Sequence, residues 1–275
     1  MLCSLFNVSQ SGYYRHHRQT PSPRARRRAQ ISQRVKQIFN IHHRRYGRPR
    51  IHQELKNQSI QLSEQTLYSI MKQHGLKARK KTGYRPKTTH TGALSTYPAN
   101  LLKELTPTTT NQVIVTDITY LATKENWLYL SAVMDLYSKT IKGYCLHDKL
   151  DVNGPLKALN RAVKRYPGLR GAIHHSDRGC QYTSHRYQKM LHLHRLKCSM
   201  SAQGYCYDNA AMESFWATLK TECVPSTGVF ADKEEARQAV FEYIEGYYNP
   251  IRIHSALEYS TPLAVEALCA KTSHS

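Results

Sequence analysis

The chain has 275 residues, 40% hydrophobic and 21% charged, and no apolar run comes near the roughly 18 residues of a transmembrane helix. This composition excludes a disordered, a fibrous or a membrane-spanning protein. Lysine and arginine number 40 against 19 acidic residues, and the net charge of +21 predicts a polyanionic partner, with nucleic acid as the first expectation.

The excess positive charge lies at the front of the chain. Residues 1–100 hold 20 basic and 2 acidic residues, a net charge of +18, whereas residues 101–275 hold 20 basic and 17 acidic residues, a net charge of +3. Such asymmetry indicates two modules, one that holds a phosphate backbone and one with a different task.

The first predicted elements are three short helices in this basic region. Apolar residues recur three and four positions apart, and Ser63 and Gly75 supply start and stop signals for the last helix. The pattern predicts a helix-turn-helix unit whose third helix enters a DNA groove, and the alternative is an ordinary helical bundle with a solvated basic face. The expected helices cover about 24–42, 51–57 and 64–74.

Basic residues at the ends of these helices are the predicted DNA contacts, trailing along the phosphates. We expect a basic N-terminal segment at 1–28, a helix-turn-helix-like DNA-binding domain at 29–87 and a linker rich in threonine and proline at 88–112. The predicted contacts in this half are Arg26, Arg27, Arg28, Arg48, Arg50, Lys77, Arg79, Lys80 and Lys81.

The second half begins with β-branched strands and then alternates helices with strands. This order predicts a mixed α/β sheet in which a three-stranded antiparallel meander comes first. We expect a catalytic core at 113–225 and a C-terminal helical segment of that core at 226–275. The expected strands cover 113–120, 127–134, about 140–146, 171–175 and 197–200, and the expected helices cover 153–166, 184–194 and 209–221.

Three carboxylates stand where this layout would bring them together. Asp117 lies within the first strand, Asp177 follows the fourth strand, and Glu213 lies on the helix after the fifth strand. Carboxylates that converge without basic partners need cations, and magnesium is the natural counter-charge. Two metal ions held in this way would carry out phosphodiester chemistry by in-line displacement.

Lys220 is seven residues after Glu213, on nearly the same side of the helix. It could therefore hold a phosphate beside a metal ion, although an i, i+7 pair on a solvated face is the alternative. On the same helix, apolar residues recur at helical spacing and are expected to bury against the sheet. These apolar residues are Met212, Phe215, Trp216 and Leu219.

Several blocks of the chain resemble one family. They are Val8–Tyr14 (VSQSGYY), Tyr46–Ile51 (YGRPRI), Thr116–Tyr120 (TDITY), His175–Tyr182 (HSDRGCQY), Tyr207–Phe215 (YDNAAMESF) and Tyr248–Ser255 (YNPIRIHS). Together they resemble the second-frame (orfB) product of the insertion-sequence-three family, whose members are DDE transposases with a retroviral-integrase-like core.

The resemblance implies an RNase H-like fold and a DDE-type DNA transposase, a polynucleotidyl transferase. Asp117, Asp177 and Glu213 would be the catalytic metal ligands for two Mg²⁺ ions, for which Mn²⁺ can substitute, and Lys220 matches the family's basic position after the glutamate. Family members nick DNA at the element's ends and use the freed 3′ hydroxyl to attack DNA. The implied partners are the terminal inverted repeats, the target DNA and other copies of the chain.

The chain departs from the family pattern at three places. Ile114 and Val115 stand where the family usually has a tryptophan, so packing there should differ with the chemistry intact. Glu258 replaces a glycine that is common after His-Ser-x-Leu. Met1 leads straight into the second-frame motif, whereas the active enzyme of the family is usually a frameshift fusion, so the upstream-frame product is an expected partner.

Two other functions stay open on this sequence. One is a catalytically incomplete second-frame product that binds DNA and modulates the fused transposase, and the other is an RNase H-like nuclease acting on structured DNA. Seven cysteines without a C-x-x-C pair predict reduced thiols. No secretory signal is visible, so we expect a bacterial cytoplasmic, nucleoid-associated protein without a membrane partner.

Several residues near the triad are weaker candidates. Asp208 is expected to cap the helix that carries Glu213, and Glu222 is a poor substitute for Glu213. His174 and His175 should point to opposite faces of their strand, which argues against a zinc site there. Arg178, and with it Gln181, could contact DNA near the cleaved bond, and the roles of Asn249, Arg252 and His254 are open.

Overall fold

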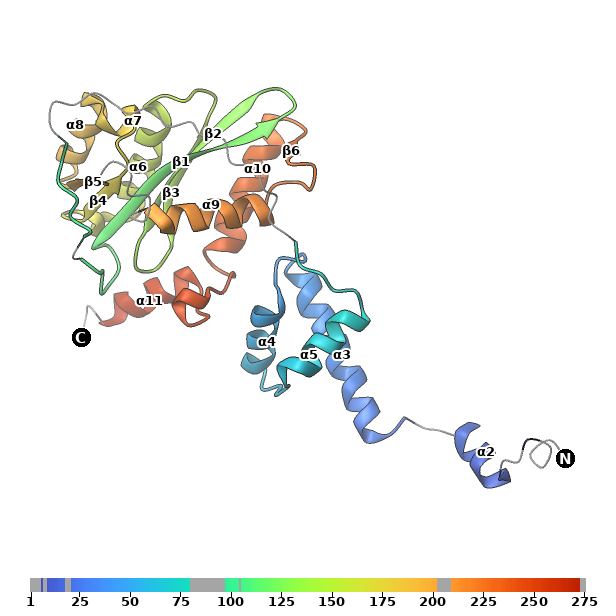
Figure 1. Ribbon diagram of the computed structural model, residues 1–275. Helices are drawn as coiled ribbons and strands as arrows, with labels where there is room; N and C mark the ends of the chain where they lie inside the picture. Colours follow the sequence, from blue (N-terminus) through green and yellow to red (C-terminus); the bar gives the residue numbers. More distant parts are fainter. Residues whose placement is uncertain are drawn as a thin grey trace. The chain divides into compact units, whose positions relative to one another are not determined.

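The computed structural model divides the chain into two compact units, residues 1–79 and 80–275 (Figure 1). It describes residues 6, 9–17, 21–79, 97–103, 105–201 and 209–272. The predicted DNA contacts Lys80 and Lys81, the predicted helix cap Asp208 and part of the predicted linker lie outside the described residues. Within the described ranges, no helix is both long and apolar enough to cross a membrane.

The first unit contains the three predicted helices and one more helix before them. Ser22 and Ser63 cap two of the helices, since each side chain accepts a hydrogen bond from a backbone N–H in the first turn. The second of the three helices begins earlier than expected, because Pro49 fits the first turn, where its missing N–H costs nothing. The helices are α2 (Gln10–His17), α3 (Pro23–Ile41), α4 (Arg48–Asn57) and α5 (Glu64–Gln73).

These helices pack around a small apolar core. The predicted periodicity is confirmed, since the residues recurring at helical spacing face inward on all three helices α3, α4 and α5. The fully or nearly fully buried side chains are Val35, Ile38, Phe39, Tyr46, Ile51, Leu55, Leu67, Ile70 and Met71.

The second unit is built on the predicted mixed sheet, with strand order β3-β2-β1-β4-β5. The first three strands pair antiparallel, and β4 and β5 add parallel to the other side of β1. A two-residue strand, β6, pairs parallel with the far end of β1. The strands are β1 (Val113–Thr123), β2 (Trp127–Asp135), β3 (Ile141–His147), β4 (Ile173–Ser176), β5 (Lys197–Met200) and β6 (Val229–Phe230).

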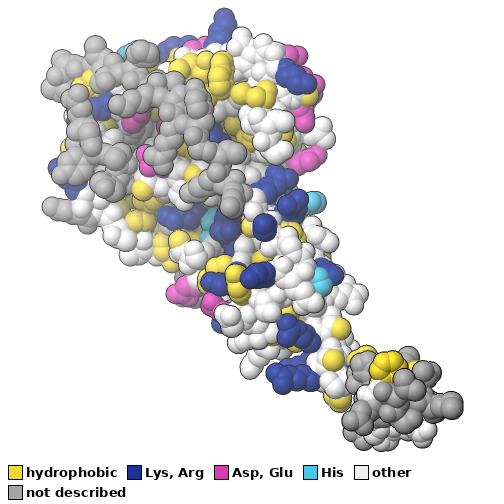
Figure 2. Space-filling model, turned by 45° about the vertical axis from the view of Figure 1, so that its right-hand side comes forward, with side chains coloured by type: hydrophobic (Ala, Val, Ile, Leu, Met, Phe, Trp, Pro, Cys, Tyr) yellow, Lys and Arg dark blue, Asp and Glu magenta, His cyan; other side chains and the backbone are white. Residues whose placement is uncertain are grey.

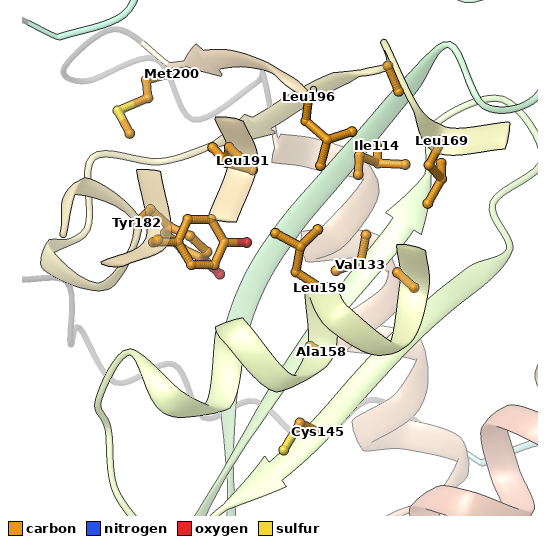
Figure 3. Close-up of a cluster of buried hydrophobic side chains, with 13 residues drawn as sticks. Ile114, Val133, Cys145, Ala158, Leu159, Leu169, Tyr182, Leu191, Leu196 and Met200 are labelled. Carbon is orange, nitrogen blue, oxygen red and sulfur yellow. The ribbon is translucent and has the colours of Figure 1, made fainter. Parts of the chain in front are cut away.

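Helices cover both faces of this sheet, with α9 on the face opposite α6 (Figure 1). The hydrophobic core on the α6 face brings together Ile114 of β1, Val133 of β2 and Leu159 of α6 (Figure 3). A Cβ at Gly143 of β3 would collide with the backbone of α6, so only glycine allows this close packing. The elements are α6 (Asn153–Arg165), η1 (Pro167–Leu169), α7 (Cys180–Thr183), α8 (His185–Leu193) and α9 (Ala210–Glu222).

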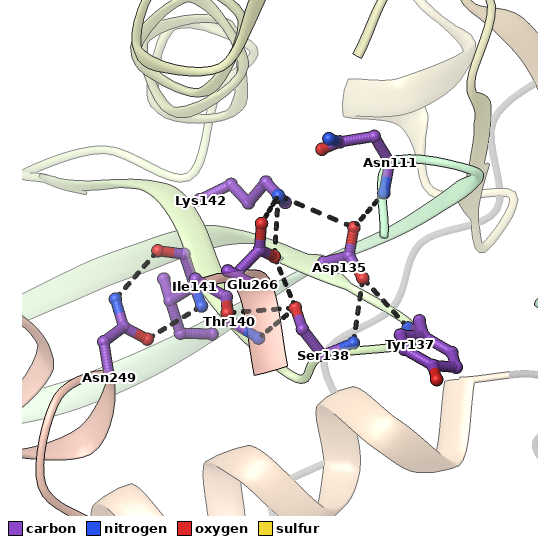
Figure 4. Close-up of polar contacts among 9 residues, drawn as sticks. All are labelled: Asn111, Asp135, Tyr137, Ser138, Thr140, Ile141, Lys142, Asn249 and Glu266. Atoms are coloured by element: carbon purple, nitrogen blue, oxygen red, sulfur yellow. Dashed lines mark hydrogen bonds and ion pairs between the residues drawn. The ribbon is translucent and has the colours of Figure 1, made fainter. Parts of the chain in front are cut away.

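The C-terminal segment is helical, as predicted, and a polar network ties it to the β2–β3 turn (Figure 4). The side chain of Asn249 both accepts from the N–H of Ile141 and donates to its C=O, at 3.0 and 3.1 Å. The buried ammonium of Lys142 lies 2.8 Å from Glu266 and 3.7 Å from Asp135. The segment consists of α10 (Lys233–Tyr243), a π-helical turn η3 (Ile244–Tyr248), η4 (Ser255–Leu257) and α11 (Pro262–Thr272).

Glu258, at the position where glycine is common in the family, has left-handed backbone angles, with φ 51° and ψ 38°. Its side chain is exposed, and a Cβ disfavours this conformation by about 1–2 kcal/mol. We expect Glu258→Gly to raise the free energy of unfolding by about 0.5–1 kcal/mol, because relief of strain exceeds the entropy that glycine adds to the unfolded chain. Urea denaturation would measure the change. Glu258→Ala keeps the Cβ, and an equal gain in that control would contradict the strain argument.

Candidate active site

Asp117 lies near the middle of β1 and faces α9. Side chains alternate along a strand, and Ile114, three residues earlier, faces α6. The indole Nε1–H of Trp216 on α9 donates to Asp117 Oδ2 at 2.9 Å, and the N–H of Ile118 donates to Oδ1 at 2.8 Å. Each oxygen of this carboxylate therefore accepts one hydrogen bond, and the other lone pairs are available to a ligand.

Asp177 directly follows β4, the parallel neighbour of β1, as predicted. The parallel pairing of β1 with β4 runs to Val115 and His175, and Asp117 and Asp177 each lie two residues further along. The two carboxylates are close enough for the charge of Asp177 to act on Asp117. The N–H of Gly179 donates to Asp177 Oδ1 at 2.9 Å. A Cβ at Gly179 would stand 2.9 Å from the same oxygen, so a glycine is needed for this close approach.

Glu213 lies in the first turn of α9, and its side chain is exposed. The predicted apolar stripe of α9 is buried, which confirms that the helix packs against the sheet. The residue that precedes the helix is Asn209, and its side chain donates to the C=O of Thr116 on β1 at 3.4 Å rather than capping α9. The stripe consists of Met212, Phe215, Trp216 and Leu219.

The electrostatics of Asp117 connect it with each of the other two carboxylates. Burial and then the charge of Asp177 raise the pKa of Asp117 to about 7, with a smaller upward contribution from Glu213. The hydrogen bonds from Trp216 and Ile118 oppose this rise. Burial also raises the pKa of Asp177, and the Gly179 N–H opposes it. Asp117 thus lies within electrostatic reach of both other carboxylates.

The donor set suits a hard divalent cation, since oxygens of repelling carboxylates are what Mg²⁺ binds. Within the described parts of the chain, none of the three carboxylates forms an ion pair. The described residues also contain no group of three His, Cys, Asp or Glu side chains close enough to hold a metal ion.

The raised pKa of Asp117 predicts a pH-dependent stability of the metal-free protein. A carboxyl group with a folded-state pKa of about 7 and an unfolded pKa of about 4 destabilises the fold progressively as pH rises between those values. We expect Asp117→Asn to stabilise the metal-free chain at pH 8 by about 2 kcal/mol, allowing for partial exposure, and to have little effect at pH 4. Thermal unfolding in EDTA at both pH values would measure this. An equal change at both values would argue against the charge as its cause.

Lys220 lies beside this cluster. Its Nζ is 4.6 Å from the centre of the Tyr120 ring, in cation–π geometry. Burial lowers the pKa of Lys220, and the charge of Asp117 opposes this change. The ammonium therefore lies at the margin of the carboxylate cluster, and its contact with a phosphate stays a prediction.

Arg178 contacts the protein itself. Its Nε–H donates to the C=O of Ser201 at 3.0 Å, and its guanidinium stacks 4.4 Å from the Tyr97 ring centre. These contacts fix the base of the side chain beside Asp177. Contact with DNA through the other guanidinium nitrogens stays a prediction.

The predicted DNA contacts of the first unit lie mostly at its surface, where Figure 2 shows clustered Lys and Arg side chains. Arg28 donates to Ser69 of α5 at 3.2 Å, which links the start of α3 to the third helix of the unit. Arg48 lies 3.8 Å from Glu64, and Arg50 is only partly exposed and stacks over Tyr46. The exposed residues of the set are Arg26, Arg27, Arg28, Arg48, Lys77 and Arg79.

Arg252, whose role was open, forms a buried ion pair with Glu222. Arg252 donates from Nε and Nη2 to the two oxygens of Glu222, the last residue of α9, at 2.9 and 2.8 Å. Glu222 is therefore held by Arg252 and cannot easily replace Glu213 as a ligand. Sequence reasoning did not find this pair, or the Trp216–Asp117 hydrogen bond, because neither leaves a local spacing signal.

The two histidines before Asp177 are buried in the strand. His174 Nε2 lies 2.9 Å from the Tyr187 hydroxyl, and His175 Nδ1 lies 2.9 Å from the Ser199 hydroxyl. Burial lowers the pKa of His174 to about 3, so it is neutral at physiological pH. Both rings help to join β4 to its neighbours.

Together the sheet, the acidic cluster and the basic helical unit define a DNA-processing enzyme with an integrase-type core. Residues 107–206 and 194–262 match two families described as integrase core domains, and residues 26–84 match an HTH-like domain. The helix-turn-helix and integrase-core predictions are therefore confirmed. DNA is the partner that this combination implies.

Known relatives extend over nearly the whole chain, which belongs to the IS3 family of insertion-sequence transposases. It is 38% identical to the insertion element IS600 31 kDa protein of Shigella sonnei, over 96% of each chain. It is 36% identical to transposase InsF for insertion sequence IS3A of Escherichia coli, over 92% of this chain and 88% of that one. The chain is also similar to a chain of a solved simian T-cell lymphotropic virus intasome, with 13% identity and a TM-score of 0.45. The alignment covers 84% of this chain and 73% of the intasome chain.

Proposed function

We propose that this chain catalyses magnesium-dependent cleavage of DNA at insertion-sequence ends, followed by strand transfer. The observation that carries the proposal is the raised pKa of Asp117, caused first by burial, then by the charge of Asp177 and, more weakly, by that of Glu213. The charges of Asp177 and Glu213 disfavour the ionised form of Asp117, and none of the three carboxylates forms an ion pair among the described residues, which favours a site that binds cations.

Asp117, Asp177 and Glu213 would hold two Mg²⁺ ions, or Mn²⁺ in their place. When bound, such ions activate an attacking water or 3′ hydroxyl and stabilise the leaving oxygen during in-line displacement. Trp216 and Gly179 orient the two aspartates, and each leaves lone pairs of its carboxylate unused. Lys220, held over Tyr120, would bind a phosphate of the DNA next to the cluster, and Arg178 would contact the strand beside Asp177.

The helical unit would bind the terminal inverted repeats while the core acts on the cleaved bond and on target DNA. We propose that the DNA-binding domain covers 29–87, after a basic segment at 1–28 and before a linker at 88–112. The catalytic core would cover 113–225, with its helical segment at 226–275. A homo-oligomer assembled on DNA would place two element ends together for strand transfer.

Neutralising Arg26, Arg27 and Arg28 together, with glutamine, tests this division of labour. All three are exposed near the start of α3. If each contacts a phosphate, the slope of log affinity against log salt should fall by about 2.7, because each contact contributes about 0.9. Fluorescence anisotropy with terminal-repeat DNA at several salt concentrations would measure the slope. An unchanged slope would exclude these arginines as phosphate contacts.

The spacing of the carboxylates favours one alternative. In this alternative the chain is a catalytically incomplete second-frame product, and among the described residues no three acidic, histidine or cysteine side chains lie close enough to hold a metal ion. It would then bind DNA and modulate a transposase fused to the upstream-frame product.

Plasmid nicking separates the two functions. The substrate carries the element's terminal repeats, and the proteins are this chain, its Asp177→Asn variant and a version fused to the upstream frame. Magnesium-dependent nicks at the repeats by this chain, absent from the variant, would support the transposase. Nicks made only by the fused version would favour the modulator, and nicks without preference for the repeats would favour a structure-specific nuclease.

A further inference from the structure

Trp216 has a polar role in a position where sequence predicts only core packing. Its side chain is 7% exposed, and its ring packs against Phe215 with ring centres 4.8 Å apart. Phe215 in turn packs edge-on against Tyr248 of the π-helical turn, also at 4.8 Å. The indole is therefore almost completely buried, and its packing against Phe215 restricts the direction of its N–H bond.

The indole has one donor and no acceptor, so its buried N–H needs an acceptor within the protein. Asp117 Oδ2 supplies it at 2.9 Å, across 99 residues of sequence. Leaving such a donor without a partner is costly, so packing of the indole also holds the carboxylate in one orientation.

The same helical turn carries Glu213, three residues before Trp216. One stretch of α9 thus carries one carboxylate of the cluster, Glu213, and the indole that donates a hydrogen bond to another, Asp117 on β1. A neutral donor suits this place, because an arginine or lysine would cancel the negative charge that attracts a cation. The hydrogen bond from Trp216 fixes Asp117 and leaves its charge in place.

We propose that Trp216 is the positioning residue of the carboxylate cluster: its N–H sets the orientation of Asp117 and fixes that carboxylate relative to the helix that carries Glu213. The inference rests on the proposed function, since it assumes that the cluster binds divalent cations. Residues that orient a metal ligand through a hydrogen bond typically change metal affinity 10- to 100-fold when they are replaced.

The test measures metal binding without DNA. Calorimetric titration with Mn²⁺ would compare the wild-type chain, Trp216→Phe and a chain with benzothienylalanine at position 216, which keeps the indole shape without the N–H. Phe215→Leu is the matched control, because it loosens the same packing and removes no donor. Melting in EDTA would show that each variant is folded.

We expect both donor-free variants to bind Mn²⁺ about 10- to 100-fold more weakly than wild type, and Phe215→Leu to bind within about threefold of it. Wild-type affinity in the folded benzothienylalanine variant would overturn the inference, and so would an equal loss in Phe215→Leu. Asp177→Asn tests the proposed function separately. If it binds Mn²⁺ as tightly as wild type, the proposed metal site is contradicted, and with it the proposed role of Trp216.

A spectroscopic readout adds an independent check. The chain has two tryptophans, so Trp127→Phe leaves Trp216 as the sole indole. Cation binding at Asp117 should change the emission of that indole through the shared hydrogen bond, with the same midpoint as the calorimetric titration. Emission that stays constant through saturation with Mg²⁺ would contradict the coupling.

Discussion

Asp177→Asn is expected to lower magnesium-dependent nicking about a thousandfold while DNA affinity stays within about twofold. Asp177 lies close enough to Asp117 for its charge to act on it, and an amide in its place removes the negative charge that the cation requires. A metal ion contributes several kcal/mol to stabilising the transition state, and about 4 kcal/mol corresponds to a factor of roughly a thousand. The basic helical unit is unchanged by this substitution. Nicking rates and anisotropy with terminal-repeat DNA would measure the two effects.

The control for this experiment is Asp148→Asn. Asp148 is a carboxylate of the same unit, paired at the surface with Lys233 and Arg237. Its loss should change nicking less than twofold, because exposed ion pairs contribute little. Loss of DNA binding in Asp177→Asn would instead mean that the core, and not only the helical unit, holds the DNA.

Much of the fold could be predicted because its elements carry periodic signals. β-branching marked β1, and apolar residues three and four apart marked α3 and α9. β6 was not predicted, because two residues are too short for any period. The one-turn helix α7 was missed for the same reason.

The residues of the site could be predicted only where the ends of strands fix their positions. Asp177 was expected near Asp117 because carboxylates at strand ends can converge on one edge of a mixed sheet. The parallel pairing of their strands, which runs to Val115 and His175, places both aspartates just beyond its last pair. The spacing of Trp216 predicts that its side chain packs in the core, which is correct for its ring. The spacing does not indicate the hydrogen-bond partner of its N–H. The direction of that bond depends on a tertiary contact 99 residues away.

Arg252, whose role could not be predicted from the sequence, is another residue whose contact depends on the tertiary structure. Nothing local in the sequence indicates that Arg252 reaches Glu222, 30 residues before it, because the two meet only after α10 and the π-helical turn fold back on α9. The sequence suggested that Glu222 lies near a possible metal site, because it is on the same helix as Glu213. The structure gives it a buried partner instead.

The Glu222–Arg252 pair predicts the largest stability effect of a single substitution in this chain. The side chains are 6% and 4% exposed, and the guanidinium binds the carboxylate through two parallel hydrogen bonds. The Tyr243 hydroxyl donates to the same carboxylate at 2.9 Å. Burial lowers the pKa of Arg252, but the hydrogen bonds and charge of Glu222 outweigh it and raise this pKa above its usual value.

Arg252→Met should destabilise the second unit by about 3–5 kcal/mol, because Glu222 would be left buried without a counter-charge. That corresponds to a fall in melting temperature on the order of 10 °C for a unit of this size. Glu222→Met combined with Arg252→Met removes both charges and should recover most of the loss, since apolar pairs of similar volume often replace buried ion pairs without cost. Thermal unfolding of the full chain and the three variants, including Glu222→Met alone, completes a double-mutant cycle.

The cycle also decides whether the pair acts on the active site. Glu222 ends the helix that carries Glu213 and Lys220, so loosening it should displace both side chains. If the double variant regains stability but nicks DNA more slowly than wild type, the ion pair positions α9 as well as stabilising it. Equal stability of Arg252→Met and the double variant would contradict the argument, because it would mean that the buried charge of Glu222 is compensated by another group.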